Sequence, residues 1–332
     1  MDEGQRSEFW AAVQRSDTER VQALLAAEPA LAAATNPDWF DAQALVNAAT
    51  RADLAMIDVL LEGGADINAK SRWWAGGWSA LHHAVDRLNT ALAQQLLEHC
   101  AEIDVHSAAG LGRAERLQGL LDADPALVHL RGPDGILPLH FASTIEVADL
   151  LLQRGAEIDA RDLDHGGTAA QWMLRGRHDV CRFLIARGAT TDIFMDCALG
   201  ELGRVEQALR RDPRLLHAET CTPPFMPAPA PGDHIYAYVL AGRAAPLHVA
   251  ARRGRRDVVD LLLAHGAEIN AKAGGSTPLH GAAFGGQLEM VRYLLSLGAD
   301  PAIRDDEHHG TPLGWAEHGG RTEVAAYLRT LE

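Results

Sequence analysis

The stretch that decides the fold reads Thr277-Pro278-Leu279-His280-Gly281-Ala282-Ala283, and Gly298-Ala299-Asp300 closes it. The threonine hydroxyl can accept from a free backbone N–H at a helix start, and proline suits the first helical position because its missing N–H costs nothing there. The pair Gly285-Gly286 can end this helix, and apolar residues then recur at helical spacing over 288–295. The stretch therefore predicts one helix–turn–helix unit followed by a loop.

Weaker copies of this unit fill most of the chain. Because one helix pair leaves apolar surface exposed on both flanks, neighbouring copies must stack to bury it. Copies occur at 41–70, 79–105, 137–160, 168–192, 245–272 and, as an end cap with a charged outer helix, at 311–332. A divergent form, which lacks T-P-L-H and ends in Asp-Pro or Glu-Pro, occurs at 7–34, 112–127 and 200–215.

The recurring residues are T-P-L-H, an alanine pair, a leucine pair and G-A-D, and in these the chain resembles an ankyrin-repeat protein. The resemblance implies an all-α solenoid of about ten helix–turn–helix units with projecting finger loops, running over 1–332 as a single array. The segments Trp73-Trp74-Ala75-Gly76-Gly77, Asp162-Leu163-Asp164-His165 and Ile235-Tyr236 are further similar to a bacterial subgroup of ankyrin proteins. No activity is carried over from that subgroup.

Composition restricts the partners. Apolar residues make up 47% of the 332 residues and aromatic residues only 5%, which suits an alanine- and leucine-rich helical array. The formal net charge of −15 repels phosphate backbones and anionic membranes, so neither nucleic acid nor a membrane surface is an expected partner. Basic partners or cationic ligands are favoured.

The cysteines and the N-terminal sequence point to a reducing compartment. Cys100, Cys181, Cys197 and Cys221 are far apart and form no C-x-x-C pair, so we expect core thiols rather than a disulfide framework or a zinc knuckle. The first residues contain no apolar signal segment, and no apolar run approaches about 18 residues. A cytoplasmic location is expected.

Three departures from the repeat concentrate in the middle of the chain. His140 and Leu151 are 11 residues apart where the regular units have 14, so the unit at 137–160 has lost three residues between its helices. Three of the seven tryptophans fall within the loop 71–78. Residues 217–244 form an insertion with a Pro-rich run over 222–232, followed by a segment that could be a short strand. A loop of this length in a compact array is usually functional or flexible.

The repeat histidines allow two interpretations. In the ankyrin pattern this histidine usually bonds to a neighbouring loop, and units stacked about 10 Å apart separate the side chains too far for one ion with bonds of about 2 Å. We therefore expect a structural role, no metal site and no cofactor. The residues concerned are His82, His140, His248 and His280, and the adjacent pairs His82-His83 and His308-His309 are no metal clamp because helical neighbours point apart.

The finger loops contain a group of polar residues that also allows two interpretations. Asp134, Asp164 and His165 could supply carboxylate and imidazole to a shared site and, if the protein is an enzyme, would perform its acid–base chemistry. The alternative is that the aspartates cap tight turns, and we favour it. G-x-S-x-G, P-loop, G-x-G-x-x-G and H-E-x-x-H motifs are all absent from the sequence.

Aromatic residues are the recognition candidates. Exposed indoles on a finger would be costly unless a partner, a ligand or another part of the chain covers them. Tyrosines two apart on a strand would share a face, and with the tryptophans they could close a pocket beneath the insertion. The candidate binding residues are Trp73, Trp74, Trp78, Trp172, Tyr236 and Tyr238.

We therefore expect a binding or scaffold protein that recognises a protein or peptide partner through its concave groove and finger loops. This expectation follows from what ankyrin arrays generally do and not from a motif in this chain. The alternative is a small-molecule site, or an enzyme, with a central pocket beneath the 217–244 insertion.

Overall fold

The computed structural model describes residues 3–223, 234–240 and 242–331, and these divide into two compact units, Met1–Asp164 and His165–Glu332. Among them, the first unit contains α1 Glu3–Gln14, α2 Thr18–Ala27, α3 Ala44–Thr50, α4 Leu54–Glu62, α5 Ala80–Asp86, α6 Thr90–Glu98, α7 Val105–Gly110, α8 Ala114–Ala123, α9 Pro138–Phe141 and α10 Ile145–Gln153. The second contains α11 Ala169–Trp172, α12 His178–Ala186, α13 Ile193–Leu199, α14 Leu202–Arg211, α15 Ile235–Val239, α16 Pro246–Arg252, α17 Arg256–Ala264, α18 Pro278–Phe284, α19 Leu288–Ser296, α20 Pro312–His318 and α21 Thr322–Arg329.

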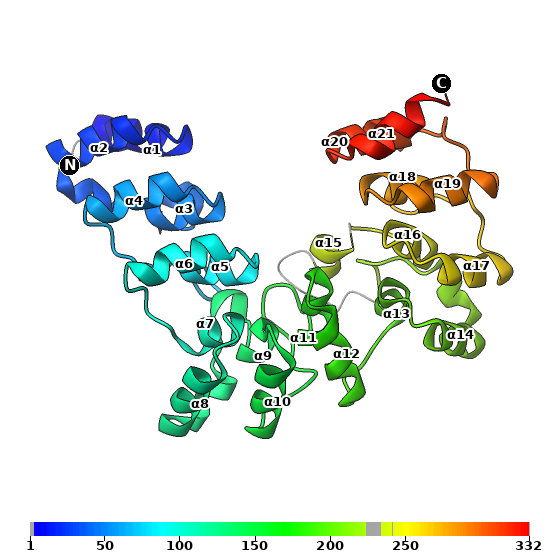
Figure 1. Ribbon diagram of the computed structural model, residues 1–332, viewed down its shortest axis with the longest axis horizontal. Helices are drawn as coiled ribbons and strands as arrows, with labels where there is room; N and C mark the ends of the chain where they lie inside the picture. The colour runs from blue at the N-terminus through cyan, green and yellow to red at the C-terminus, as the bar shows by residue number, and fades with distance from the viewer. Residues whose placement is uncertain (1–2, 224–233, 241, 332) are drawn as a thin grey trace. The chain divides into compact units, whose positions relative to one another are not determined.

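The α-helices of the described residues form helix–turn–helix pairs, beginning with α1 and α2 and then α3 and α4, as the repeat predicts. The short helix α15 stands outside these pairs. In the first unit α1, α3 and α5 lie along one side and α2, α4 and α6 along the other, and α16, α18 and α20 face α17, α19 and α21 in the same way in the second unit (Figure 1). The predicted all-α architecture of stacked helix–turn–helix units is confirmed. The extension of that stack over the whole chain stays a prediction.

The repeat formed by α18 and α19 has the predicted turn residues and buried leucines. Pro278 is the first residue of α18, and the chain leaves that helix through Gly286, whose φ of +73° is left-handed. Leu279 in α18 and Leu294 in α19 are fully buried. The two helices therefore present their apolar faces to each other and to the neighbouring pairs.

The shortened unit and the divergent units each have a local cause. In the shortened unit α9 spans only four residues, and the Thr144 hydroxyl caps α10 by accepting from Val147 N at 3.2 Å, so no glycine is needed in the turn. The Asp-Pro ends of the divergent units form 3-10 helices because Pro fits the first position and the preceding Asp124 or Asp212 accepts from the second residue. The 3-10 helices are η1 Pro29–Ala33, η2 Pro37–Trp39, η3 Pro125–His129, η4 Pro133–Gly135, η5 Met173–Arg175 and η6 Pro213–His217.

In the described part of the chain, the two β-strands lie in one finger, and isolated bridges join Lys70 to Ser79 and Ala273 to Ser276. β1 Thr35–Asn36 pairs antiparallel with β2 Ala42–Gln43, with Thr35 opposite Gln43 and Asn36 opposite Ala42. The expectation of a short strand in the insertion is wrong. Residues Ile235–Val239 form the helix α15, which the His234 side chain caps by accepting from Tyr236 N at 3.3 Å. The Pro-rich residues 224–233 lie outside the described residues. None of the described helices combines the length and the apolar character needed to cross a membrane.

Two of the repeat histidines, His248 and His280, connect their repeat to the next one. His280 Nδ1 accepts from Thr277 N at 3.2 Å, and its Nε2 donates to Gly310 O at 3.1 Å, just before α20 begins. His248 Nε2 donates to Ser276 O at 2.9 Å in the same way, just before α18 begins. Burial lowers the pKa of His248 to about 4, although its bond to the Ser276 carbonyl opposes that shift. These imidazoles are neutral structural donors, as expected.

Truncating the shared core of α18 and α19 tests the packing. We expect Leu294→Ala to lower the free energy of unfolding by about 2–5 kcal/mol, because it removes fully buried methyl groups and leaves a cavity. The measurement is urea unfolding followed by circular dichroism. Leu297→Ala is the matched control, since Leu297 is the C-cap residue directly after the same helix but is exposed, and its cost should stay within about 0.5 kcal/mol. Equal losses for the two variants would contradict this packing.

A second prediction concerns pH. The folded protein keeps His248 neutral until about pH 4, while an unperturbed histidine binds a proton near pH 6.5, so acidification through that interval favours the unfolded chain. We expect this residue to remove up to about 3 kcal/mol of the free energy of unfolding across the interval. Denaturant titrations of wild type and His248→Gln from pH 7 to pH 4 measure it as the difference between the two curves. A constant difference would show that His248 does not titrate as described.

Candidate functional site

Backbone hydrogen bonds join the finger loops of the first unit. Within the loop 71–78, Ser71 N donates to Trp78 O at 2.9 Å. Asp134 N donates to Gly76 O at 3.1 Å, and Asp134 O accepts from the backbone of Leu163 and Asp164. A Cβ at position 76 would lie 2.0 Å from Gly132 O, so glycine is required where the two fingers meet. Three fingers that belong to different repeats of the first unit are thus fixed to one another.

Two of the three finger tryptophans are anchored by carboxylates. Trp78 Nε1 donates to Asp134 Oδ1 at 2.8 Å, and Trp73 Nε1 donates to Asp164 Oδ2 at 3.0 Å. Both aspartates are buried, and both indoles are partly buried. The Trp78 ring also stacks on His83 with centroids 4.9 Å apart, and burial lowers the pKa of that histidine to about 3. The carboxylates proposed for acid–base chemistry therefore hold the aromatic residues in place.

The third finger tryptophan is exposed and belongs to an aromatic cluster. Trp74 is 57% exposed, and its ring centroid lies 6.4 Å from that of Trp73. Trp73 in turn meets Phe40 edge to face at 4.4 Å, and Phe40 is 53% exposed. We call Phe40, Trp73 and Trp74 the aromatic finger cluster. Trp39, next to Phe40 in sequence, is also exposed.

Sequence reasoning did not identify Phe40. It lies in the turn between β1 and β2 with a φ of +53°, and its carbonyl accepts from Arg72 N at 2.6 Å. The sequence did offer a signal, the aromatic pair Trp39-Phe40 in the loop before the helix pair α3–α4. The pair Trp73-Trp74 occupies the corresponding loop before the helix pair α5–α6.

The remaining aromatic candidates lie in the second unit. Tyr236 is fully buried; its hydroxyl donates to Asp192 and accepts from Gln171 Nε2 at 2.9 Å. Trp172 is buried as well, while Tyr238 is 57% exposed with its ring 4.9 Å from that of His165. The expected common face of Tyr236 and Tyr238 is wrong, because residues two apart on a helix point in different directions.

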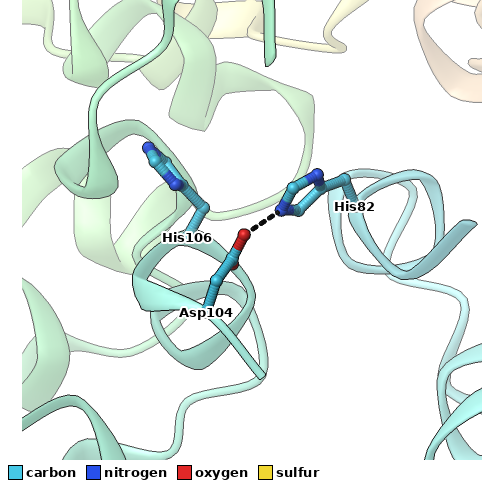
Figure 2. A group of neighbouring side chains, drawn as sticks. All are labelled: His82, Asp104 and His106. Atoms are coloured by element: carbon cyan, nitrogen blue, oxygen red, sulfur yellow. Dashed lines mark hydrogen bonds and ion pairs between the residues drawn. The ribbon is translucent and has the colours of Figure 1, made fainter. Parts of the chain in front are cut away.

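The first unit also contains three side chains with metal-ligand chemistry, His82, Asp104 and His106 (Figure 2). One possible ligand atom from each lies within 4.8 Å of the others. His82 Nδ1 accepts from Ser79 N, so its Nε2 carries the proton that it donates to Asp104 Oδ2 at 2.9 Å. His106 Nε2 donates to Leu130 O at 3.0 Å.

Hydrogen bonding accounts for this cluster without an ion. Burial alone would raise the pKa of Asp104, but the hydrogen bonds from His82 and Ser107 outweigh it and hold the pKa well below its usual range. Burial also lowers the pKa of His106 to about 4. Because the Nε2 protons of both imidazoles are already donated, a metal would have to displace them. The cluster is the repeat histidine bond with Asp104 in place of a backbone carbonyl.

Comparisons with known proteins agree with this architecture. The family model "Ankyrin repeats (3 copies)" matches residues 9–109 and 239–305, and "Ankyrin repeat" matches 134–163. The chain is 31% identical over 107 residues to the SMC5-SMC6 complex localization factor protein 1 of Bos taurus, covering 29% of this chain and 10% of that protein. It is 30% identical over 90 residues to the ankyrin repeat and SAM domain-containing protein 6 of Mus musculus, covering 26% and 10%.

A solved structure is among the proteins that this chain is similar to. The crystal structure of the human ASB11 ankyrin repeat domain is 23% identical, with a TM-score of 0.42, and the match covers 69% of this chain and 97% of that one. The chain spans only about a tenth of the length of the curated relatives that it matches. The family models match half of the chain, and with the stacked helix pairs and the histidine bonds between them they show that this chain belongs to the ankyrin-repeat family.

Proposed function

We propose that this chain binds a protein or peptide partner through the aromatic finger cluster. Ankyrin repeats are typically protein-interaction modules. The observation that carries the proposal is that the side chains of Trp74 and Phe40 are each more than half exposed. They lie on the fingers of two successive repeats of the first unit. Large aromatic side chains dominate the energy of binding interfaces, whereas leaving them in water gives the free protein no stability.

The cluster is prepared for binding because its base is already fixed. Trp73, which lies between Phe40 and Trp74, is held by its hydrogen bond to Asp164, and Phe40 O is held by Arg72 N. A partner that covers the exposed rings therefore has little conformational entropy to remove from this surface.

Charge favours a basic partner. The chain carries a formal net charge of −15, and Asp38 and Asp41 flank Trp39 and Phe40 in sequence. The face of an indole attracts a lysine or arginine cation by about 0.5–1 kcal/mol at an exposed site. We therefore infer a peptide segment that alternates basic and apolar side chains, and we do not expect nucleic acid as a partner.

The finer expectations about origin and location stay proposals. We propose membership of the bacterial ankyrin subgroup that the Trp73-Trp74 loop resembles, and a reducing, cytoplasmic compartment. The cysteines support the latter, because Cys100, Cys181 and Cys197 are free thiols and Cys100 is free although it is exposed. We propose a binding protein rather than an enzyme, since Asp134 and Asp164 bind the finger tryptophans.

A random peptide display library tests the proposal on the full chain. Selection on wild type should enrich peptides with lysine or arginine beside apolar residues, and these peptides should bind Trp74→Ala at least about tenfold more weakly. The matched control is Leu297→Ala, which removes an exposed apolar side chain from the second unit and should bind them unchanged. Enrichment of acidic peptides, or equal binding by Trp74→Ala, would refute the proposal.

A separate prediction distinguishes the two tryptophans by stability. Trp73→Phe removes the N–H that Asp164 accepts, so we expect it to lower the free energy of unfolding by about 1–3 kcal/mol. Trp74→Phe keeps an exposed ring and should change it by no more than about 0.5 kcal/mol. Urea unfolding of the two variants measures both. Similar values would mean that the bond to Asp164 does not hold the cluster.

A further inference from the structure

The second unit contains a pocket of about 750 Å³ beside the first helices of its last three pairs. Arg252 at the end of α16, Phe284 at the end of α18 and Trp315 in α20 line it, and Tyr238 of α15 and Glu307 of the loop before α20 contribute further walls. These helices lie on the same side of the unit (Figure 1). The lining thus combines three aromatic rings with a guanidinium group, and His308 and His318 also line it.

The aromatic walls are fixed in position. Trp315 Nε1 donates to the buried Asp305 Oδ2 at 2.9 Å, and the Trp315 ring meets Phe284 edge to face at 6.0 Å. The Arg252 guanidinium lies over the Phe284 ring, 4.7 Å from its centroid. A planar ligand would therefore meet surfaces that are already placed for stacking.

Arg252 differs from the arginines around it in its partners. Arg253 donates to Val239 O at 2.6 Å, Arg255 to Ala198 O at 2.9 Å and Arg321 to Phe284 O at 2.9 Å. In the part of the chain that the structure describes, the Arg252 guanidinium has neither a hydrogen-bond acceptor nor a carboxylate within ion-pair distance. The pocket carboxylate, Glu307, is exposed and lies 3.9 Å from His308 Nε2 instead.

The surroundings of Arg252 disfavour its charged form, as its pKa shows. Burial lowers its pKa to about 10, and the positive charges of Arg253 and Arg321 lower it further. A half-buried cation with cationic neighbours destabilises the fold unless an anion compensates it. These three arginines lie near one another in a chain whose formal net charge is −15.

We propose that this pocket binds an aromatic carboxylate, whose carboxylate pairs with Arg252 and whose ring stacks among Phe284, Trp315 and Tyr238. The guanidinium fork matches a carboxylate with two parallel N–H donors, and the rings supply the apolar contact. The ligand is either a free small molecule or the C-terminal aromatic residue of a peptide, which present the same chemistry. The proposal uses none of the residues of the aromatic finger cluster and is independent of it.

Calorimetric titration of the full chain tests the site with defined probes. 1-Naphthoate should bind saturably, and its uncharged analogue 1-naphthamide should bind at least about tenfold more weakly, because only the former offers a charged acceptor. The tripeptide Gly-Gly-Phe, as free acid and as amide, shows whether the ligand is a small molecule or the C-terminus of a peptide. Tighter binding of the free acid than of 1-naphthoate would assign the site to a peptide C-terminus, and the reverse order would assign it to a small molecule.

Variants of Arg252 separate recognition from folding. Arg252→Gln should weaken 1-naphthoate binding at least about tenfold, while Arg252→Lys, which keeps the charge but loses the fork, should weaken it less. The melting temperature of Arg252→Gln should stay equal or rise, since the cost of a half-buried charge that has no carboxylate partner in the described residues offsets the contact with the Phe284 ring. The matched control is Arg256→Gln: Arg256 also lies over an aromatic ring, that of Tyr293 at 3.8 Å, but outside the pocket.

Three results would overturn the proposal: equal binding of 1-naphthoate and 1-naphthamide, undiminished binding by Arg252→Gln, or no saturable binding of either carboxylate. If Arg252→Gln were to unfold, the comparison of Arg252→Lys with Arg256→Gln would still decide. A melting temperature lowered by Arg252→Gln with binding intact would show that Arg252 is structural.

Discussion

A pair of short helices cannot bury its own apolar surface, and this constraint governs the structure. Most helices of the array span only seven to ten residues, too short to be stable alone in water. Each pair is therefore stable only while its neighbours cover it, as Leu279 and Leu294 show by being fully buried. The histidine bonds to the loop ahead of the next first helix, from His248 and His280, fix how neighbouring pairs meet.

Stacking of this kind leaves the loops free to differ. In the fingers of the first unit, Gly76, Asp134 and Asp164 join the loops to one another through backbone and indole hydrogen bonds. Such a loop can present an exposed ring without losing its conformation. In the two divergent repeats that end in Asp-Pro, the second helix is followed by a 3-10 turn, and the aspartate and the proline end the repeat without glycine.

Several buried polar side chains in the described residues are paired with other side chains. Asp104 accepts from His82 and Ser107, Tyr236 bonds Asp192 and Gln171, and the finger carboxylates accept from indoles. The guanidinium of Arg252 differs because no carboxylate of the described residues lies within ion-pair distance of it. The side chain of Trp74 differs from the buried apolar residues because it is exposed. Features that cost the free protein stability are expected where a partner or ligand compensates them.

The sequence by itself determined the repeat, the helix pairs and the structural role of the histidines, because turn residues and helical periodicity act over a few positions. It also located Trp73, Trp74 and Trp78 in one loop. Only the tertiary structure decided that Asp134 and Asp164 anchor Trp78 and Trp73, that Phe40 joins the exposed cluster, and that Tyr236 is core. These facts depend on contacts between residues dozens of positions apart, and exposure and pairing of a side chain are set by which distant groups the stacking brings to it.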